Sequence, residues 1–223
     1  MPARHPSPHL GLVAVIHTVL FNAGLYFVIS FTGAPHYPGP WESSETIASY
    51  FQNHSREALL CAFLQFGAAI PLGIYSASIV SRLEFLGVRA AGATIALFGG
   101  FMTAINMAAA ALILWVMAYP GIAQNEAALG ALYYLTFAIG GVGFSVPIGL
   151  LMAGVCVPAA FMKLLPRWLI IFGFALAVIG ELSALSLVLP KTLLLIPLTR
   201  FPGFVWLIGA GFALPRSKPN EVL

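Results

Sequence analysis

Long apolar runs alternate with short polar segments along the whole chain. Each run is close to or longer than the ~20 residues that a helix needs to cross a bilayer. Six spans are predicted, at about Leu10–Phe31, Ala58–Val80, Ala90–Ala118, Leu129–Val155, Leu169–Leu189 and Thr192–Leu214. The pattern therefore predicts an all-α fold, in which residues 1–223 form a single transmembrane domain, a polytopic bundle of six helices.

The one substantial loop, residues 32–57, lies between the first two predicted spans. Glycine and proline crowd its start and exclude regular structure there. A serine at position 43 or 44 can then cap a short helix that runs through Gln52. Three apolar residues recur on one side of this helix, namely Ile47, Tyr50 and Phe51. We expect an amphipathic helix lying on the membrane surface, with Trp41 as an interfacial anchor.

Composition supports an integral membrane protein. The 223 residues are 60% hydrophobic and 8% charged, whereas an ordinary soluble domain is about 25% charged. No polar stretch is long enough to form a separate soluble domain. The formal charge of +3 does not indicate nucleic-acid binding, because the basic residues lie in short loops that set topology. The predicted partner is the lipid bilayer.

The distribution of lysine and arginine predicts the orientation of the spans. If the N-terminus is inside, the inner segments hold seven basic residues: Arg4, Arg82, Arg89, Lys163, Arg167, Arg216 and Lys218. The outer segments then hold two, Arg56 and Lys191. This bias predicts that both termini are cytoplasmic and that loop 32–57 lies outside.

Two charges fall inside the last two predicted spans, Glu181 in the fifth and Arg200 in the sixth. A charge at the centre of a membrane helix costs about 2.5–3.5 kcal/mol on insertion scales. At a rise of about 1.5 Å per residue, Glu181 lies roughly 12 Å and Arg200 roughly 7 Å below the outer face. We expect the two to form an ion pair between antiparallel helices. The alternative is that Arg200 extends to the headgroups and that Glu181 is protonated.

Three further polar residues fall at similar depth in the outer leaflet. Gln65 lies about 10 Å below the outer face, and Tyr133 and Tyr134 lie about 6 Å below it. With Glu181 and Arg200 they form one predicted polar layer, our candidate ligand-binding site. A small cavity that opens outward has this composition, and so does an interhelical hydrogen-bond network, which is the more common case.

Small residues spaced four apart predict close helix packing. The third span carries Gly92, Ala96, Gly100, Ala104 and Ala108, and the fourth carries Gly141, Ser145, Gly149 and Ala153. We expect these two spans to pack tightly in the middle of the bundle. A homodimer interface is the alternative for a stripe that remains exposed.

No group of residues in the sequence matches a recognised catalytic or cofactor-binding pattern. His17 has no second histidine within a span to share a haem or a metal, and Ser145 lacks the following glycine of a nucleophile elbow. His36, Glu42 and His54 match no standard metal spacing. We therefore predict no enzyme activity, no cofactor and no metal site.

Residues 45–214 contain short motifs shared with known sequences. They are Ile47–His54 before the second span, Pro166–Trp168 before the fifth, and Phe201–Trp206 with Leu214-Pro215 near the end. In these motifs the chain resembles a broad group of uncharacterised bacterial membrane proteins. The resemblance implies a six-span protein of the bacterial inner membrane. The group has no agreed activity, so the resemblance assigns no functional residue.

Two functional interpretations follow from the residues. The first is a non-catalytic membrane protein that binds a small or lipid-like molecule, or a membrane partner, through its outer polar layer. The second is a small proton-coupled transporter in which Glu181 titrates. An enzyme acting on lipids is the least favoured alternative, because the spans hold few acid–base groups.

Overall fold

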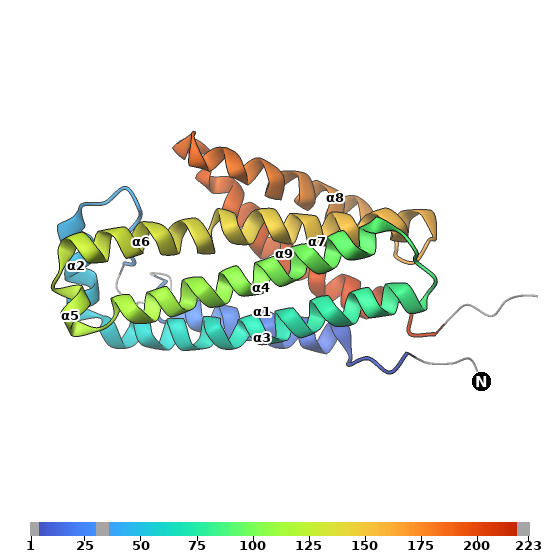
Figure 1. Ribbon diagram of the computed structural model, residues 1–223, viewed down its shortest axis with the longest axis horizontal. Coiled ribbons are helices and arrows are strands. Elements are labelled where there is room, and N and C mark those ends of the chain that lie inside the picture. The colour runs from blue at the N-terminus through green and yellow to red at the C-terminus, as the bar shows by residue number, and fades with distance from the viewer. Residues whose placement is uncertain (1–4, 30–35, 218–223) are drawn as a thin grey trace, which may run out of the picture.

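The computed structural model describes residues 5–29 and 36–217, and this part of the chain is all-helical (Figure 1). Its α-helices are α1 Leu10–Tyr26, α2 Ser44–Asn53, α3 Ser55–Phe85, α4 Ala91–Met117, α5 Pro120–Ala123, α6 Glu126–Gly140, α7 Val142–Phe161, α8 Arg167–Leu182 and α9 Leu195–Ala213. Two 3-10 segments, η2 Ser183–Leu187 and η3 Pro190–Leu194, join α8 to α9.

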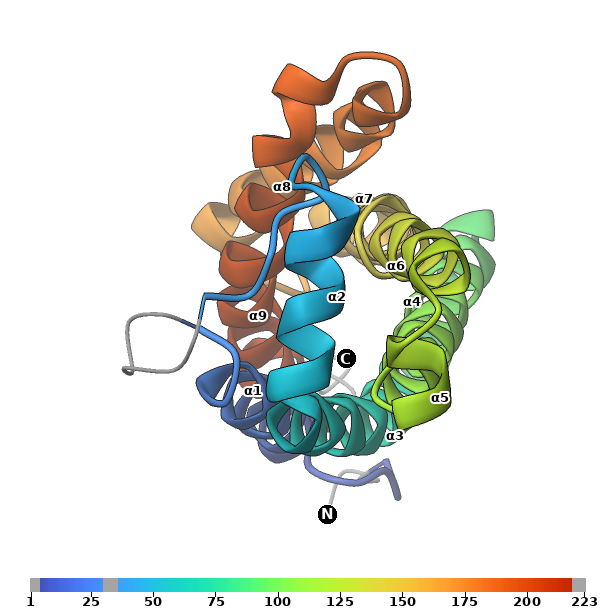
Figure 2. The same ribbon diagram turned by 90° about the vertical axis from the view of Figure 1, so that its left-hand side faces the viewer.

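The long helices form a closed ring when viewed along the bundle (Figure 2). Each one packs against its neighbours in the order α8, α7, α4, α3, α1 and α9, and α9 returns to α8. The tip of the α8–α9 hairpin stops short of the end of the bundle where α2 and α5 lie (Figure 1). At that end α6 packs against α4 and α2.

Within residues 5–29 and 36–217, five helical segments are long and apolar enough to cross a membrane. They are Ser55–Phe85, Ala91–Met117, Glu126–Phe161, Arg167–Leu187 and Pro190–Ala213. This architecture is consistent with a membrane protein. The first predicted span is a shorter apolar helix of 17 residues, Leu10–Tyr26. The count of six therefore remains a prediction.

The fourth predicted span is not one regular helix. It divides into α6 and α7 at Gly141, whose φ of −87° and ψ of −90° are not helical. The side chain of Asn106 on α4 donates to the carbonyl of Gly143 at 2.5 Å, next to the break. The break exposes backbone polar groups inside the bundle, and such groups are tolerated at membrane depth only within protein or beside a cavity.

Glycines bring α4 and α7 into close contact, so the predicted packing of the third and fourth spans is confirmed, although Gly99 and Gly154 lie outside the predicted stripes. A Cβ atom on Gly99 would lie 2.5 Å from the carbonyl oxygen of Pro147, and one on Gly154 would lie 2.6 Å from the Ala96 nitrogen. The predicted stripe of α7, however, faces a different helix. Gly149 and Ser145 approach α8, where a Cβ on Gly180 would lie 2.7 Å from the Ser145 carbonyl oxygen.

Helix α2 lies across one end of the ring (Figure 2). The side chain of Ser43 caps it by accepting a hydrogen bond from the Thr46 amide at 3.2 Å. Its apolar residues Ile47 and Phe51 are buried, and Phe51 packs against Tyr133 of α6 with ring centroids 6.4 Å apart. The apolar side of α2 therefore packs on protein, so it is not available to hold the helix on a membrane surface. Trp41 is largely exposed.

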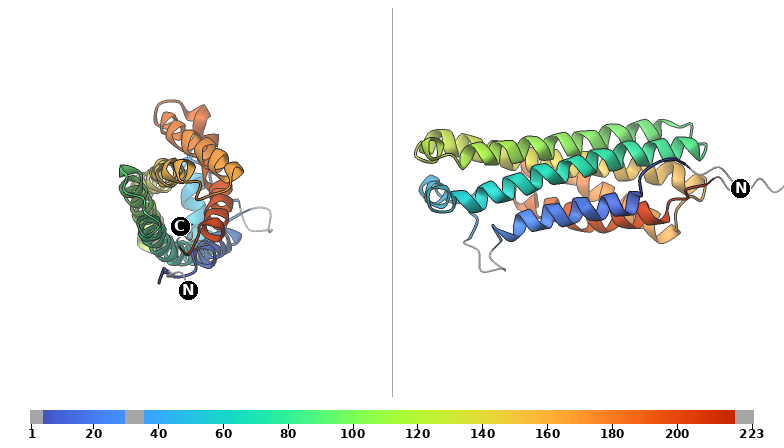
Figure 3. Two further views of the ribbon diagram at one scale, coloured as in Figure 1. Left: turned by 90° about the vertical axis from the view of Figure 1, so that its right-hand side faces the viewer. Right: turned by 90° about the horizontal axis from the view of Figure 1, so that it is seen from below.

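The opposite end of the bundle is joined by contacts between the two ends of the described chain. Helix α1 begins and α9 ends there (Figure 3), and the His5 amide donates to the Arg216 carbonyl at 2.9 Å. Arg82, which is buried, donates to the Ser7 hydroxyl at 2.6 Å and to the carbonyls of Pro8 at 3.1 Å and Leu214 at 3.5 Å.

Candidate functional site

A cavity of about 270 Å³ lies inside the ring, at the level of α6. Its wall is mostly apolar and comes from α1, α3, α4, α6, α7 and α9. The lining residues include Phe21, Leu25, Val28, Met107, Ala110, Leu114, Phe137, Phe144 and Ile196, and the polar residues Tyr37, Gln65, Tyr133, Thr136 and Arg200. A few polar groups in an apolar cavity are typical of a small-molecule site.

Arg200 of α9 projects into this cavity between two aromatic rings. Its guanidinium carbon lies 4.6 Å from the ring centroid of Phe144 and 5.4 Å from that of Phe21. One nitrogen, Nη2, donates to the carbonyl of Gly140, at the end of α6. The Nε atom is buried and has no hydrogen-bond partner among the described residues. The helix break at Gly141 thus supplies an acceptor for a cation that is otherwise surrounded by aromatic faces.

Other polar groups line the cavity closer to α2. The hydroxyl of Thr136 is buried without a hydrogen-bond partner in the described part of the chain. Within the described residues, the one hydrogen bond of the Gln65 side chain goes to the sulfur of Cys61, at 3.4 Å, and sulfur is a weak acceptor. An unpaired buried hydroxyl costs about 1–3 kcal/mol, so these groups are suited to bind a polar group of a ligand.

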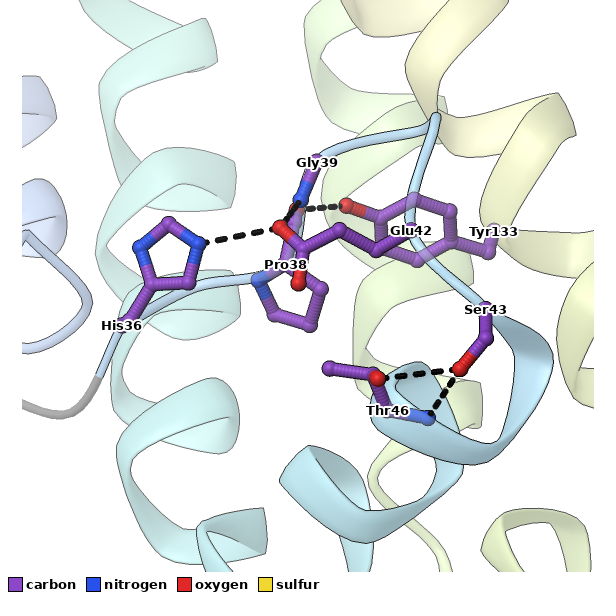
Figure 4. Close-up of polar contacts among 7 residues, drawn as sticks. All are labelled: His36, Pro38, Gly39, Glu42, Ser43, Thr46 and Tyr133. Carbon is purple, nitrogen blue, oxygen red and sulfur yellow. Dashed lines mark hydrogen bonds and ion pairs between the residues drawn. The ribbon is translucent and has the colours of Figure 1, made fainter.

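The loop around Pro38 and Gly39 lies against Tyr133 of α6 (Figure 4), and its Tyr37 lines the cavity. The hydroxyl of Tyr133 donates to the Pro38 carbonyl. The carboxylate of Glu42 accepts from the Gly39 amide at 2.6 Å and from the ring of His36 at 2.9 Å. These two bonds, the Gly39 bond above all, lower the pKa of Glu42. Burial raises the pKa of Tyr37, which stacks on Tyr133, well above its usual value.

The expected ion pair between Glu181 and Arg200 is wrong. Glu181 is exposed on α8, and the one acid–base contact within 4 Å among the described residues joins His36 to Glu42. The reason is the direction of the side chain. The neighbouring residues Ala177 and Gly180 form the face of α8 that packs on α7, and one residue further along a helix points about 100° away.

Three of the five predicted site residues do meet at the cavity, namely Gln65, Tyr133 and Arg200. Tyr134 does not, because it follows Tyr133 on the same helix and points outward. It is 57% exposed, and its hydroxyl donates to the Pro40 carbonyl at 3.1 Å. Depth alone places Glu181 and Tyr134 in the predicted polar layer, and depth says nothing about the side of the helix on which a residue lies.

Sequence reasoning missed several lining residues that a helical pattern could have shown. Thr136, Phe137 and Gly140 follow Tyr133 at spacings of three, four and seven, and such positions share one face of a helix. The aromatic faces of Phe21 and Phe144 had no distinguishing signal, because phenylalanine is common throughout the spans.

His17 is a buried packing residue. Its Nδ1 atom donates to the Ala68 carbonyl at 2.8 Å, and its ring packs edge-on against Phe204 at 5.2 Å. Cys61 and Cys156 are both buried thiols. Among the described residues no group of three histidine, cysteine or acidic side chains is placed to hold a metal ion.

Comparisons with protein-family models, with curated proteins and with solved structures give no match to this chain. The resemblance to bacterial six-span proteins therefore stays a prediction.

Proposed function

We propose that this chain is a non-catalytic multi-pass membrane protein of the bacterial inner membrane that binds a small, lipid-like molecule in its outer half. The observation that carries the proposal is the apolar cavity of about 270 Å³ with buried, incompletely bonded polar groups. This volume is near the lower end of the ~300–1,000 Å³ usual for ligand pockets, so we infer a small ligand.

The proposal includes six crossings with both termini cytoplasmic. The path of α1 supports it, because α1 begins beside the end of α9 and runs toward the end of the bundle where α2 lies (Figure 3). Its 17 residues span about 25 Å at 1.5 Å per residue, which is most of a hydrocarbon core of ~30 Å.

Filling the cavity tests the proposal. Leu114 on α4 is buried and lines the cavity, whereas Leu112 on the same helix is half exposed and lies outside it. We expect Leu114→Trp to abolish saturable binding of decanol or decanoate to protein in nanodiscs, and Leu112→Trp to preserve it. If neither decanol nor decanoate bound saturably to the wild type, the proposed function would be contradicted.

A small transporter is the second candidate, and the broken helix supports it. Discontinuous helices whose ends meet bound ligands are common in transporters, and α6 and α7 separate beside Arg200. The proton-coupled version, in which Glu181 titrates, has less support because Glu181 is exposed and outside the cavity. It predicts that Glu181→Gln leaves folding intact and abolishes proton-coupled uptake of decanoate into proteoliposomes; unchanged uptake would exclude it.

A further inference from the structure

We propose that the ligand of this cavity is a single-chain amphiphile with one carboxylate head group, which pairs with Arg200. This inference rests on the proposed function, because it names the chemical class of molecule that the same cavity takes.

Arg200 carries an incompletely paired charge into the cavity. Its guanidinium stays charged in a protein, and a charge in an apolar interior needs a partner. Here the described protein supplies one backbone acceptor and two aromatic faces, and Nε remains unbonded. An anion is the missing partner, because a guanidinium has five N–H donors arranged to bind two carboxylate oxygens at once.

Charge balance selects the kind of anion. Arg200 is the one charged residue among those described around the cavity. All seven acidic residues of the chain are glutamates, and none of those described lines the cavity. A carboxylate would neutralise the single positive charge. A phosphate monoester carries about −1.5 to −2 at pH 7 and would leave excess negative charge in an apolar site.

The rest of the cavity suits an alkyl chain. Leu25, Met107, Ala110, Leu114 and Phe137 line it, and burying each CH₂ group against such apolar side chains favours binding. Thr136 and Gln65 offer polar groups to a ligand that carries a hydroxyl or a second polar group along its chain.

The test compares three probes of equal chain length that differ in head group: decanoate, decanol and decylamine. Binding of each radiolabelled probe is measured at pH 8 to wild-type protein in lipid nanodiscs, with empty nanodiscs subtracted. A charge-assisted bidentate pair is stronger than a neutral hydrogen bond. We expect decanoate to bind at least about tenfold more tightly than decanol, a difference of about 1.4 kcal/mol, and decylamine to bind least.

Variants then assign the preference to one side chain. Arg200→Gln should reduce decanoate affinity about tenfold and leave decanol affinity nearly unchanged, and Arg200→Lys should give an intermediate value because it retains charge but not the two-donor geometry. The matched control is Arg56→Gln, which removes an exposed arginine outside this cavity and should change neither affinity.

The outcomes separate the two proposals. Equal affinities of the wild type for decanoate and decanol would overturn the carboxylate inference and leave a neutral lipid-like ligand. A preference for decanoate that persists in Arg200→Gln would also overturn it. Failure of every probe to bind saturably would overturn the proposed function itself. If the Arg200 variants do not fold, the comparison of decanoate with decanol on the wild type still tests the carboxylate inference.

Discussion

At the scale of single residues, the two arginines inside the bundle differ in how their charge is satisfied. Arg82 has three protein acceptors, which come from the start of the described chain and from the end of α9. Arg200 has one among the described residues, the Gly140 carbonyl. We therefore assign Arg82 to folding and Arg200 to binding, and the two should respond differently to substitution.

Arg82→Gln should destabilise the protein by about 2 kcal/mol, because hydrogen bonds to a charged group contribute about 1.5–3 kcal/mol each and glutamine replaces them in part. The exposed Arg89, in the turn between α3 and α4, provides the control. Arg89→Gln should change stability by less than about 0.5 kcal/mol. The free energy of unfolding in mixed micelles measures both, and equal losses would show that the bonds of Arg82 contribute nothing specific.

The loop around Pro38 and Gly39 should loosen in acid. Bonds from Gly39 and His36 lower the pKa of Glu42. The carboxylate therefore stabilises the loop above the ordinary glutamate pKa of about 4.3, and this stabilisation disappears as the pH falls through the lowered pKa. Hydrogen exchange at the Gly39 amide, divided by its intrinsic rate, should increase between about pH 5 and pH 3.

The matched pair for this experiment is Glu42→Gln and Glu45→Gln. Glu42→Gln should remove the pH dependence of hydrogen exchange at the Gly39 amide. Glu45 lies on the exposed side of α2, so Glu45→Gln should leave that pH dependence unchanged. If Gly39 exchange in the wild type is independent of pH, the Glu42 contact does not hold the loop.

Residue types could be predicted from the sequence, but their directions could not. Hydropathy and depth identified Gln65, Tyr133 and Arg200, which line the cavity. The same reasoning included Glu181 and Tyr134, which point outward. Depth depends on sequence position alone, whereas direction depends on which face a helix presents to its neighbours. In a span that is apolar on all sides, the sequence does not mark that face.

At the scale of elements, backbone contact between helices organises the bundle. The α4–α7 contact depends on Gly99 and Gly154, which leave no space for a side chain. Lipid tails are as apolar as leucine, so van der Waals packing at such contacts is a main source of helix association in a membrane.

Gly99→Ala should destabilise the protein by about 1–3 kcal/mol, the usual cost of overpacking, because its Cβ would lie 2.5 Å from the Pro147 carbonyl oxygen. Gly67 on α3 is the control, since a Cβ there meets no atom within 4 Å. Gly67→Ala should be neutral or slightly stabilising, as alanine is the better helix former. Thermal unfolding in detergent compares the two. A Gly99→Ala variant as stable as the wild type would show that the α4–α7 contact can relax.

Small-residue spacing predicted which elements pack closely but not every pairing. The stripe that includes Gly149 is in contact, yet with α8 rather than α4. Spacing shows that one face of a helix is narrow and does not identify the helix that uses it. The break at Gly141 was also missed, because a Gly-Gly pair in an apolar run is equally compatible with a continuous helix.

At the scale of the whole molecule, the ring of helices has two different ends. One end carries α2 and the loop around Pro38 and Gly39, and the other joins the start of α1 to the end of α9. The basic residues are concentrated toward the second end, where Arg82, Arg89, Lys163, Arg167 and Arg216 lie. By the positive-inside rule the second end faces the cytoplasm. The loop around Pro38 and Gly39, at the opposite end of the bundle, is therefore predicted to face outward.

Labelling with a membrane-impermeant thiol reagent tests this orientation. The two native cysteines are buried, so a background of Cys61→Ala and Cys156→Ala leaves only the introduced thiol. Glu45→Cys lies on the exposed side of α2, and Arg89→Cys lies in the exposed turn between α3 and α4. In right-side-out vesicles we expect labelling at position 45 alone, and in inverted vesicles at position 89 alone. The reverse result would place the cavity toward the cytoplasm. Labelling at both positions from one side would mean that α3 does not cross the membrane. That result would contradict the six-span topology and the proposed location of the binding site in the outer leaflet.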